Sequence, residues 1–378
     1  MKIGFVLDDS LDKTDGVQQY VLTLGQWLSN TGHEVHYITG QTNRTDISNI
    51  HSLSRNMGVR FNQNYMTTPL PASRRKIKQL LLEQHFDVLH VQMPYSPFLA
   101  GRVIKCAPKN TAIIGTFHIL PYSRLESLAT RLLSIILYGS RKRFDRVLSV
   151  SKPAAEFALS YFGQVSSVVP NAVDVRRFYR GKKIWQRSDG KLTIVYLGRL
   201  VERKGCMYLL MALRELKKQK ALKDVHVIIA GKGPLLSSLQ KFVRDNRLTK
   251  LVKFVGYVSE EDKPDILASA DIAVLPSIGG ESFGIVLVEA MAAGADVVIA
   301  GDNTGYRTVM TGHGDQLIDP TKTTEFADLL KEFISSKNAR KSAKKWQAQR
   351  AKQYDVENVG KQILKVYQQA LKSKFKMR

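Results

Sequence analysis

The sequence predicts an α/β protein built from two doubly wound domains, each with a parallel sheet between layers of helices. Apolar, β-branched runs alternate with helical patterns along the whole chain, which is typical of parallel α/β layers. The chain has 378 residues, more than one hydrophobic core usually organises. A polar, basic, glycine-containing stretch at 180–190 separates two similar series of strands, so we place the domain boundary there.

Each half of the chain supplies one series of predicted strands. In the first half these are Ile3–Leu7, Val35–Thr39, Val88–Val91, Ala112–Phe117, Val147–Val150 and Ser167–Val169. In the second half they are Leu192–Leu197, Val225–Ala230, Val252–Tyr257, Ile272–Leu275 and Val297–Ala300. Helices lie between them; the one at Val17–Asn30 ends just before Gly32, a common helix stop. We expect domains at 1–180 and 190–357, with ligands in a cleft at the carboxyl ends of the strands.

The charge of the chain indicates an anionic partner. There are 57 Lys and Arg against 33 Asp and Glu, a net charge of +24. Nucleic acid, an acidic membrane surface and phosphorylated substrates all fit such a balance. Cys106 and Cys206 form no disulfide framework, which suits a reducing cytoplasm. The sequence starts directly as a strand, and its longest apolar segment, Leu128–Tyr138, is too short to span a bilayer. We therefore expect a cytoplasmic protein, or one bound to a membrane from the cytosolic side.

Residues 279–294 carry the strongest functional signal. The strand Ile272–Leu275 runs into a glycine pair, Glu281 follows, and a helix that contains Glu289 begins near Phe283. Glycines at a strand-to-helix turn let backbone N–H groups approach a ligand, and a helix N-terminus favours an anion. The pattern predicts a phosphate at 282–286 with a carboxylate on either side. A plain structural turn is the alternative, because glycine-rich turns of this kind are common.

Four other strand ends carry candidate ligand-binding residues. Gly16 opens a helix after the first strand, and His118 directly follows the strand Ala112–Phe117. Arg199 and Lys204 share one loop and could clamp a phosphate. Gly231 closes the next strand in a turn that could border a base or ribose. Each has a structural alternative: a loop glycine, a structural histidine, or an exposed basic loop.

Taken together these motifs resemble the family 4 retaining glycosyltransferases, which have the GT-B fold. The resemblance spans almost the whole chain. The segments that carry it are Asp15–Gln18, Phe117–His118, Pro170–Asp174, Gly198–Arg199, Lys204–Gly205, Ala230–Pro234 and Glu281–Gly284 with Glu289. Seven residues separate Glu281 from Glu289, which matches the two-glutamate motif of that family. The amino-acid sequence of residues 279–294 is especially similar to that of bacterial phosphatidylinositol mannosyltransferases.

The resemblance implies a role for each matching position. Arg199 and Lys204 would hold the diphosphate of a nucleotide-sugar donor, with Gly16 near it. Glu281 would bind hydroxyls of the donor sugar, and Glu289 would hold the ribose. Backbone amides at Phe283, Gly284 and Ile285 would complete the diphosphate site, and His118 would lie at the reacting sugar. No divalent metal and no cofactor besides the donor is expected. The last helix, at 358–378, would pack back on the first domain.

The sequence departs from the family pattern at three places. Asp15-Gly16 stands where the family has Gly-Gly, Asn171-Ala172 where it has Asn-Gly, and 303–306 where it has a segment leading to a glutamate. These changes bear on the sugar and the acceptor rather than on the reaction class. Glu281 and Glu289 do not fit a hydrolase pair, since such carboxyls flank the scissile bond. We expect same-face attack, because no side chain stands out as a covalent nucleophile.

A basic helix at 72–84 predicts contact with a membrane. Arg74, Arg75, Lys76 and Lys78 accompany Leu82, a combination suited to a lipid headgroup layer. A solvated basic helix is the alternative. The segment 120–138, after His118, could shape a lipid acceptor groove or form a buried helix.

The leading hypothesis is a hexosyltransferase at the inner face of the cell membrane. The first candidates are mannose from GDP-mannose as the donor and phosphatidylinositol or another glycolipid precursor as the acceptor. The alternative is a soluble enzyme that builds oligosaccharide or polysaccharide from a UDP- or GDP-sugar. A nucleic-acid-binding protein is a third hypothesis; it draws on the charge but has no recognisable motif.

Overall fold

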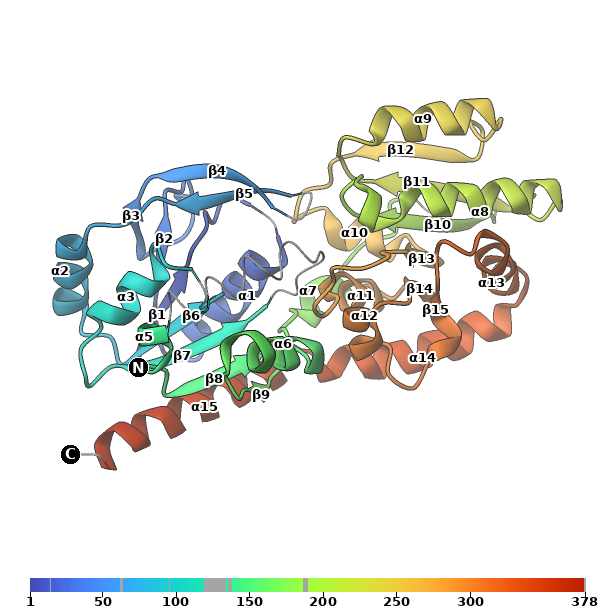
Figure 1. Cartoon of the computed structure of the whole chain (residues 1–378). Coiled ribbons are helices and arrows are strands. Elements are labelled where there is room, and N and C mark those ends of the chain that lie inside the picture. Colours follow the sequence, from blue (N-terminus) through green and yellow to red (C-terminus); the bar gives the residue numbers. More distant parts are fainter. Residues whose placement is uncertain are drawn as a thin grey trace. The chain divides into compact units, whose positions relative to one another are not determined.

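The computed structural model describes residues 1–13, 15–61, 64–94, 96–118, 134, 138–185 and 190–376, and the chain divides into two compact units (Figure 1). Unit 1 comprises Met1–Ala172 and Val356–Arg378, and unit 2 comprises Val173–Asp355. The sequence predicts that the first domain ends at residue 180, whereas the first segment of unit 1 ends at Ala172. The reason is α7 (Val175–Tyr179), which packs on α10 (Lys263–Ala268) and α11 (Ile285–Ala292) of unit 2.

Unit 1 contains a parallel sheet of seven strands in the order β3-β2-β1-β6-β7-β8-β9. The strands are β1 (Lys2–Leu7), β2 (Glu34–Gly40), β3 (Ile50–Ser54), β6 (Val88–Gln92), β7 (Ala112–Phe117), β8 (Arg146–Ser149) and β9 (Ser167–Val168). The sequence predicts all of these except β3. It also misses the hairpin of β4 (Asn56–Phe61) and β5 (Asn64–Pro69). The strand order reverses between β1 and β6, where ligands of doubly wound sheets bind.

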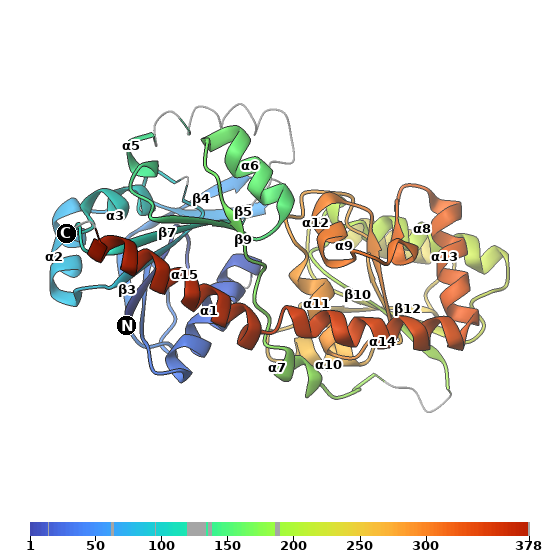
Figure 2. The ribbon, with the colours of Figure 1, turned by 90° about the horizontal axis from the view of Figure 1, so that it is seen from below.

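Helices cover both faces of this sheet. They are α1 (Gly16–Asn30), α2 (Arg74–Gln84), α3 (Ala100–Cys106), α5 (Tyr138–Arg141), α6 (Lys152–Phe162) and α15 (Val356–Lys376). Figure 2 shows α15 beside α1, and both bury apolar side chains against one face of the sheet. In α15 these are Val359, Ile363, Tyr367 and Ala370, at helical spacing. α2 and α3 cover the opposite face. The predicted segment 120–138 lies almost wholly outside the described residues.

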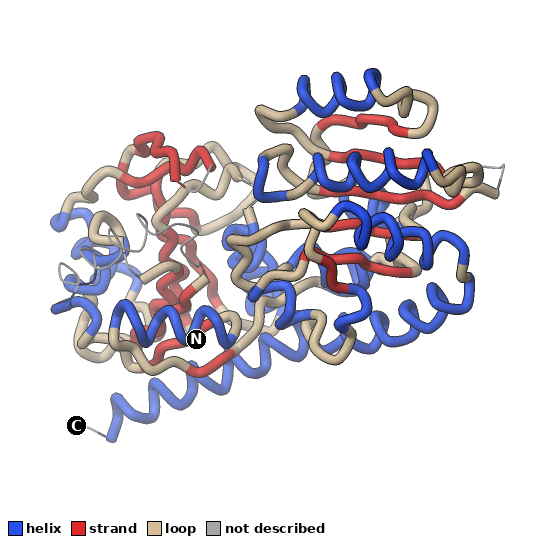
Figure 3. Tube along the Cα trace, turned by 45° about the vertical axis from the view of Figure 1, so that its right-hand side comes forward, coloured by secondary structure: helices blue, strands red, loops and turns tan. Residues whose placement is uncertain are grey.

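Unit 2 contains a parallel sheet of six strands in the order β12-β11-β10-β13-β14-β15. The strands are β10 (Leu192–Leu197), β11 (Val225–Ala230), β12 (Val252–Gly256), β13 (Ile272–Leu275), β14 (Val297–Gly301) and β15 (Leu317–Ile318). Besides α7, α10 and α11, its helices are α8 (Cys206–Lys218), α9 (Leu236–Asp245), α12 (Thr304–Val309), α13 (Thr323–Ser335) and α14 (Lys337–Gln353). In Figure 3 the helices, in blue, lie outside the red strands of this sheet. The strand order of this sheet reverses between β10 and β13, and we call this place the switch point of unit 2.

No helix in the described ranges combines the length and the apolar character needed to cross a bilayer.

Candidate active site

The loops that follow β10 and β13 meet at the switch point of unit 2. The first loop forms a short 3-10 turn at Glu202–Lys204 and ends at Gly205, whose φ of 73° is in the left-handed region. A Cβ on Gly205 would collide with the carbonyl oxygen of Pro276 in the second loop. Glycine is therefore required here on two grounds, backbone conformation and close approach. The contact brings the basic residues of the first loop to the carboxylate of the second.

Glu281 is held by three donors that all reach the same oxygen. Its Oε1 accepts hydrogen bonds from Arg203 (2.8 Å), from Lys204 Nζ (2.7 Å) and from Ser277 Oγ (2.8 Å). Burial alone would raise the pKa of Glu281, but the charges of Lys204 and Arg203 and these hydrogen bonds lower it to about 2. We call Glu281, Arg203, Lys204 and Ser277 the Glu281 cluster. It fixes an ionised carboxylate in one orientation.

The predicted pair Arg199 and Lys204 lies in this region together with Glu281. Burial lowers the pKa of Lys204, the charge of Glu281 and its hydrogen bond raise it, and the positive charges of Arg203 and Arg199 lower it. Sequence reasoning did not single out Arg203. Only 4% of Arg203 is exposed, because the 3-10 turn directs this side chain inward beside Glu281.

The N-terminus of α11 lies next to the Glu281 cluster. The helix begins at Ile285 and not near Phe283, with Gly284 as its N-cap at a φ of 108°. The Phe283 ring is buried against Tyr354, so only the backbone of this residue can serve a ligand. Gly284 has no room for a Cβ beside Tyr306. The backbone N–H groups of the predicted site thus open a helix, a favourable environment for an anion.

Glu289 belongs to a different ion cluster. It lies on α11, 5% exposed, and both carboxylate oxygens accept from Lys263 Nζ, at 3.1 and 3.4 Å. Lys263 also pairs with Glu260 at 2.8 Å. Burial lowers the pKa of Lys263, but the charges of Glu289 and Glu260 raise it more. Since Glu281 and Glu289 are tied to separate cations and Glu281 stays ionised, they do not form an acid and base pair.

Gly231 lies at the end of β11, in the loop beside the one that follows β10. Its φ is 148°, and its N–H donates to the carbonyl of Gly256 at 2.6 Å. A Cβ on Gly231 would collide with the carbonyl oxygen of Gly198, so this turn also depends on glycine.

Gly16 and His118 lie in unit 1, Gly16 at the start of α1 and His118 directly after β7. Gly16 is exposed and is the first residue of α1, after Asp15 as N-cap. Two residues on, Gln18 is buried and donates to Asp9 Oδ2 at 3.1 Å. His118 is 4% exposed, and its Nε2 lies 2.7 Å from Gln92 Oε1. Burial lowers the pKa of His118 to about 3, so the imidazole is neutral at physiological pH.

The predicted membrane-contact residues are all on the surface of α2. Arg74, Arg75, Lys76 and Lys78 are exposed, and Leu82 is 65% exposed. The opposite side of the helix buries Ile77, Leu80 and Leu81. In the part of the chain that the structure describes, no three His, Cys, Asp or Glu side chains are grouped so that they could hold a metal ion.

Two family models and several named proteins match this chain. Residues 14–177 match the family model described as Glycosyltransferase Family 4, and residues 180–353 match Glycosyl transferases group 1. The chain is 32% identical to a phosphatidyl-myo-inositol mannosyltransferase of Mycolicibacterium smegmatis, over 97% of this chain and 94% of that protein. It is 28% identical to a GDP-mannose-dependent alpha-(1-6)-phosphatidylinositol monomannoside mannosyltransferase of the same organism, over 69% of this chain and 72% of that protein.

Solved structures confirm the fold. A HepE protein of Anabaena in complex with UDP and glucose superposes with a TM-score of 0.73 at 17% identity, covering 98% of this chain and all of that one (100%). A glycosyltransferase from Rickettsia africae superposes with a TM-score of 0.75 at 15% identity, covering 98% of both chains. The predicted GT-B fold of two Rossmann-like units is confirmed, and the chain is a glycosyltransferase. On its sequence, fold and relatives, it belongs to the family 4 glycosyltransferases.

Proposed function

We propose that this enzyme transfers a hexose, with retention of anomeric configuration, from a nucleotide sugar to a membrane lipid at the inner face of the cell membrane. The first candidates are GDP-mannose as donor and a phosphatidylinositol-type lipid as acceptor, in line with the names of the relatives. The observation that carries the proposal is the Glu281 cluster. It joins a fixed carboxylate to a buried arginine and a partly buried lysine at the switch point of a doubly wound sheet.

The donor diphosphate would bind between the cationic side chains and the start of α11. Lys204 and Arg199 supply positive charge, and backbone N–H groups from Phe283 to Ile285 supply donors. These groups are already in place before the nucleotide leaves, so they would stabilise the charge that develops on it. Gly231, in the loop after β11, would border the nucleotide.

The two glutamates would recognise hydroxyl groups. Oε1 of Glu281 is taken by three donors, so Oε2 is the oxygen that would accept from a hydroxyl of the donor sugar. Glu289 would accept from the ribose, while Lys263 holds its carboxylate in place. His118 would accept or donate one hydrogen bond at the reacting sugar as a neutral imidazole. None of these residues is arranged as a covalent nucleophile activated by a neighbouring base.

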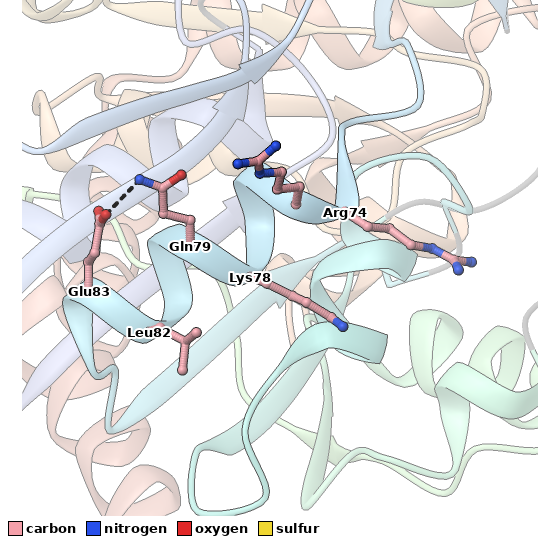
Figure 4. Close-up of a pocket in the computed structure, with 6 residues that line it drawn as sticks. Arg74, Lys78, Gln79, Leu82 and Glu83 are labelled. Atoms are coloured by element: carbon pink, nitrogen blue, oxygen red, sulfur yellow. Dashed lines mark hydrogen bonds between the residues drawn. The ribbon is translucent and has the colours of Figure 1, made fainter.

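An exposed stripe on α2 supports a membrane acceptor. Arg74, Lys78 and Leu82 are spaced four residues apart, so they project from one side of the helix, as Figure 4 shows. Arg75 begins the neighbouring stripe, in which Gln79 donates to Glu83 at 2.8 Å. These side chains line a shallow hollow of about 680 Å³. Basic heads around an exposed leucine suit an anionic headgroup layer.

The first test is a donor panel. GDP-mannose and a set of UDP- and GDP-sugars would be compared for thermal stabilisation, and the best donors would then be offered extracted membrane lipids. The preferred donor should stabilise the fold by about 2.7 kcal/mol at a hundredfold excess over its dissociation constant. NMR of the glycolipid product should show the anomeric configuration of the donor. An inverted product, or transfer to soluble glycans with none to lipid, would contradict the proposal.

The second test measures binding to vesicles. We expect Arg74, Arg75 and Lys78 changed together to Gln to weaken binding to anionic phospholipid vesicles by about 100-fold, with less effect as salt rises. The matched control changes three exposed lysines of α14, Lys337, Lys341 and Lys345, to Gln and removes the same charge. Equal losses in both variants would show that net charge, and not α2, drives binding. If the wild-type protein does not bind the vesicles, the result would favour a soluble acceptor.

A further inference from the structure

Gln92 and His118 form a buried pair at the ends of two adjacent strands. Gln92 is the last residue of β6 and is fully buried, and β6 pairs in parallel with β7 so that Gln92 lies opposite Thr116. His118 follows β7 directly, and its Nε2 lies 2.7 Å from Gln92 Oε1. No motif marks Gln92, and the proposed mechanism does not use it.

The surroundings of Gln92 fix which way its amide points. The Nε2 of Gln92 donates to the backbone carbonyl oxygen of His90 at 3.4 Å. A carbonyl oxygen can only accept, so the NH₂ end of the amide must be on that side. The oxygen Oε1 then faces His118, and it too can only accept. Nε2 of the imidazole must therefore carry the hydrogen.

We propose that Gln92 is a positioning residue for glycosyl transfer, which holds His118 as the Nε2–H tautomer so that Nδ1 can accept a hydrogen bond from a substrate hydroxyl in place of the Asn171 side chain. The inference rests on the proposed role of His118. It deepens that role, because it assigns one nitrogen and one direction to the hydrogen bond. His118 then acts as a neutral acceptor and not as a cation or a general acid.

The other groups around His118 leave the imidazole neutral. The ring centroids of Tyr20 and His118 lie 5.0 Å apart, the Asn171 side chain forms a hydrogen bond with the His118 imidazole, and His90 lies near it. Asn171 is 4% exposed and uncharged. Burial lowers the pKa of both His90 and His118 to about 3, and burial raises the pKa of Tyr20 above its usual range. None of these side chains supplies a charge near neutral pH.

Two substitutions of Gln92 separate positioning from packing. Gln92→Leu removes the acceptor at similar volume, and Gln92→Glu keeps an acceptor but adds a charge that favours imidazolium. The tautomer is read by ¹⁵N NMR of histidine-labelled full-length protein without substrate, with His118→Asn to assign the signals. We expect the Nε2–H form in the wild type and a mixture of tautomers in Gln92→Leu. A wild-type Nδ1–H signal, or no change in Gln92→Leu, would overturn the inference.

Transfer kinetics give the second readout. Gln92→Leu should lower kcat about tenfold at every pH, with KM for the donor little changed. In Gln92→Glu, kcat should be near normal at about pH 9. As the pH is lowered and His118 becomes protonated, kcat should fall by about tenfold per pH unit. A pH-independent loss in Gln92→Glu would mean that Gln92 only packs, and would overturn the inference. If His118→Asn shows normal transfer while the NMR spectra still show that Gln92 sets the tautomer, the proposed role of His118 in transfer is wrong. In that case the pairing of Gln92 with His118 still stands.

Discussion

Glu281→Gln is expected to lower kcat by about 100- to 1,000-fold. The amide keeps the shape of the side chain and one acceptor oxygen, but it loses the charge that three donors now share. The buried Arg203 and the partly buried Lys204 are then left without a counter-charge, and their donors can turn away from the position where the sugar and diphosphate must bind. Transfer measured under donor saturation checks this. Turnover within about threefold of wild type would remove Glu281 from the active site.

The same substitution should destabilise the protein, because breaking a buried ion pair strands the remaining charges. Removal of one partner typically costs about 3 to 5 kcal/mol, and denaturant unfolding measures the loss. The matched control is Glu215→Gln on α8, where a partly exposed glutamate pairs with Lys218 at 3.0 Å and with Arg214 at 3.1 Å. Its stability and activity should stay at wild-type levels, because exposed pairs contribute little. A Glu281→Gln protein that still binds nucleoside diphosphate but does not transfer would separate catalysis from folding.

The fold was predictable because its signals are local. Runs such as Ile272–Leu275 and Val297–Ala300 are apolar throughout, which is typical of strands buried on both faces. The elements that the sequence did not predict are those without a continuous apolar run. β3 reads Ile-His-Ser-Leu-Ser and is half-exposed, so its composition resembles a loop. α7 is five residues long, and only its packing on α10 and α11 assigns it to unit 2.

The site was predictable only in part, because its partnerships cross long stretches of sequence. Glu281 and Lys204 could be matched to a family pattern, but Arg203 is adjacent to Lys204 and only the 3-10 turn decides that both reach Glu281. Lys263 is on another helix from Glu289 and is not marked by any motif. Gln92 lies at the end of an apolar run, where a buried polar residue is easily read as part of the strand.

The buried histidines predict how the protein responds to acid. His90 bonds Tyr367 at 2.7 Å and Thr116 at 2.6 Å, and it and His118 have pKa values near 3 in the folded state because burial penalises the imidazolium. Below an ordinary pKa of 6.5 the unfolded chain binds protons that the folded chain cannot. The stability from each histidine is thus fully present above about pH 6.5. It falls by about 1.4 kcal/mol per pH unit as the pH drops toward 3.

Asp8 acts in the opposite direction. Burial raises its pKa to about 7 from an ordinary 3.8, so between these values the folded chain holds the extra proton and stability rises as the pH falls. Unfolding free energies at about pH 6 and about pH 5 should therefore depend on pH more steeply in Asp8→Asn than in wild type, by about 1.4 kcal/mol per pH unit. In His118→Asn the slope of stability against pH should be lower by the same amount, and in the variant with both His90→Asn and His118→Asn it should be lower by twice as much. Parallel curves for all these proteins would show that the three groups titrate alike in the folded and unfolded states.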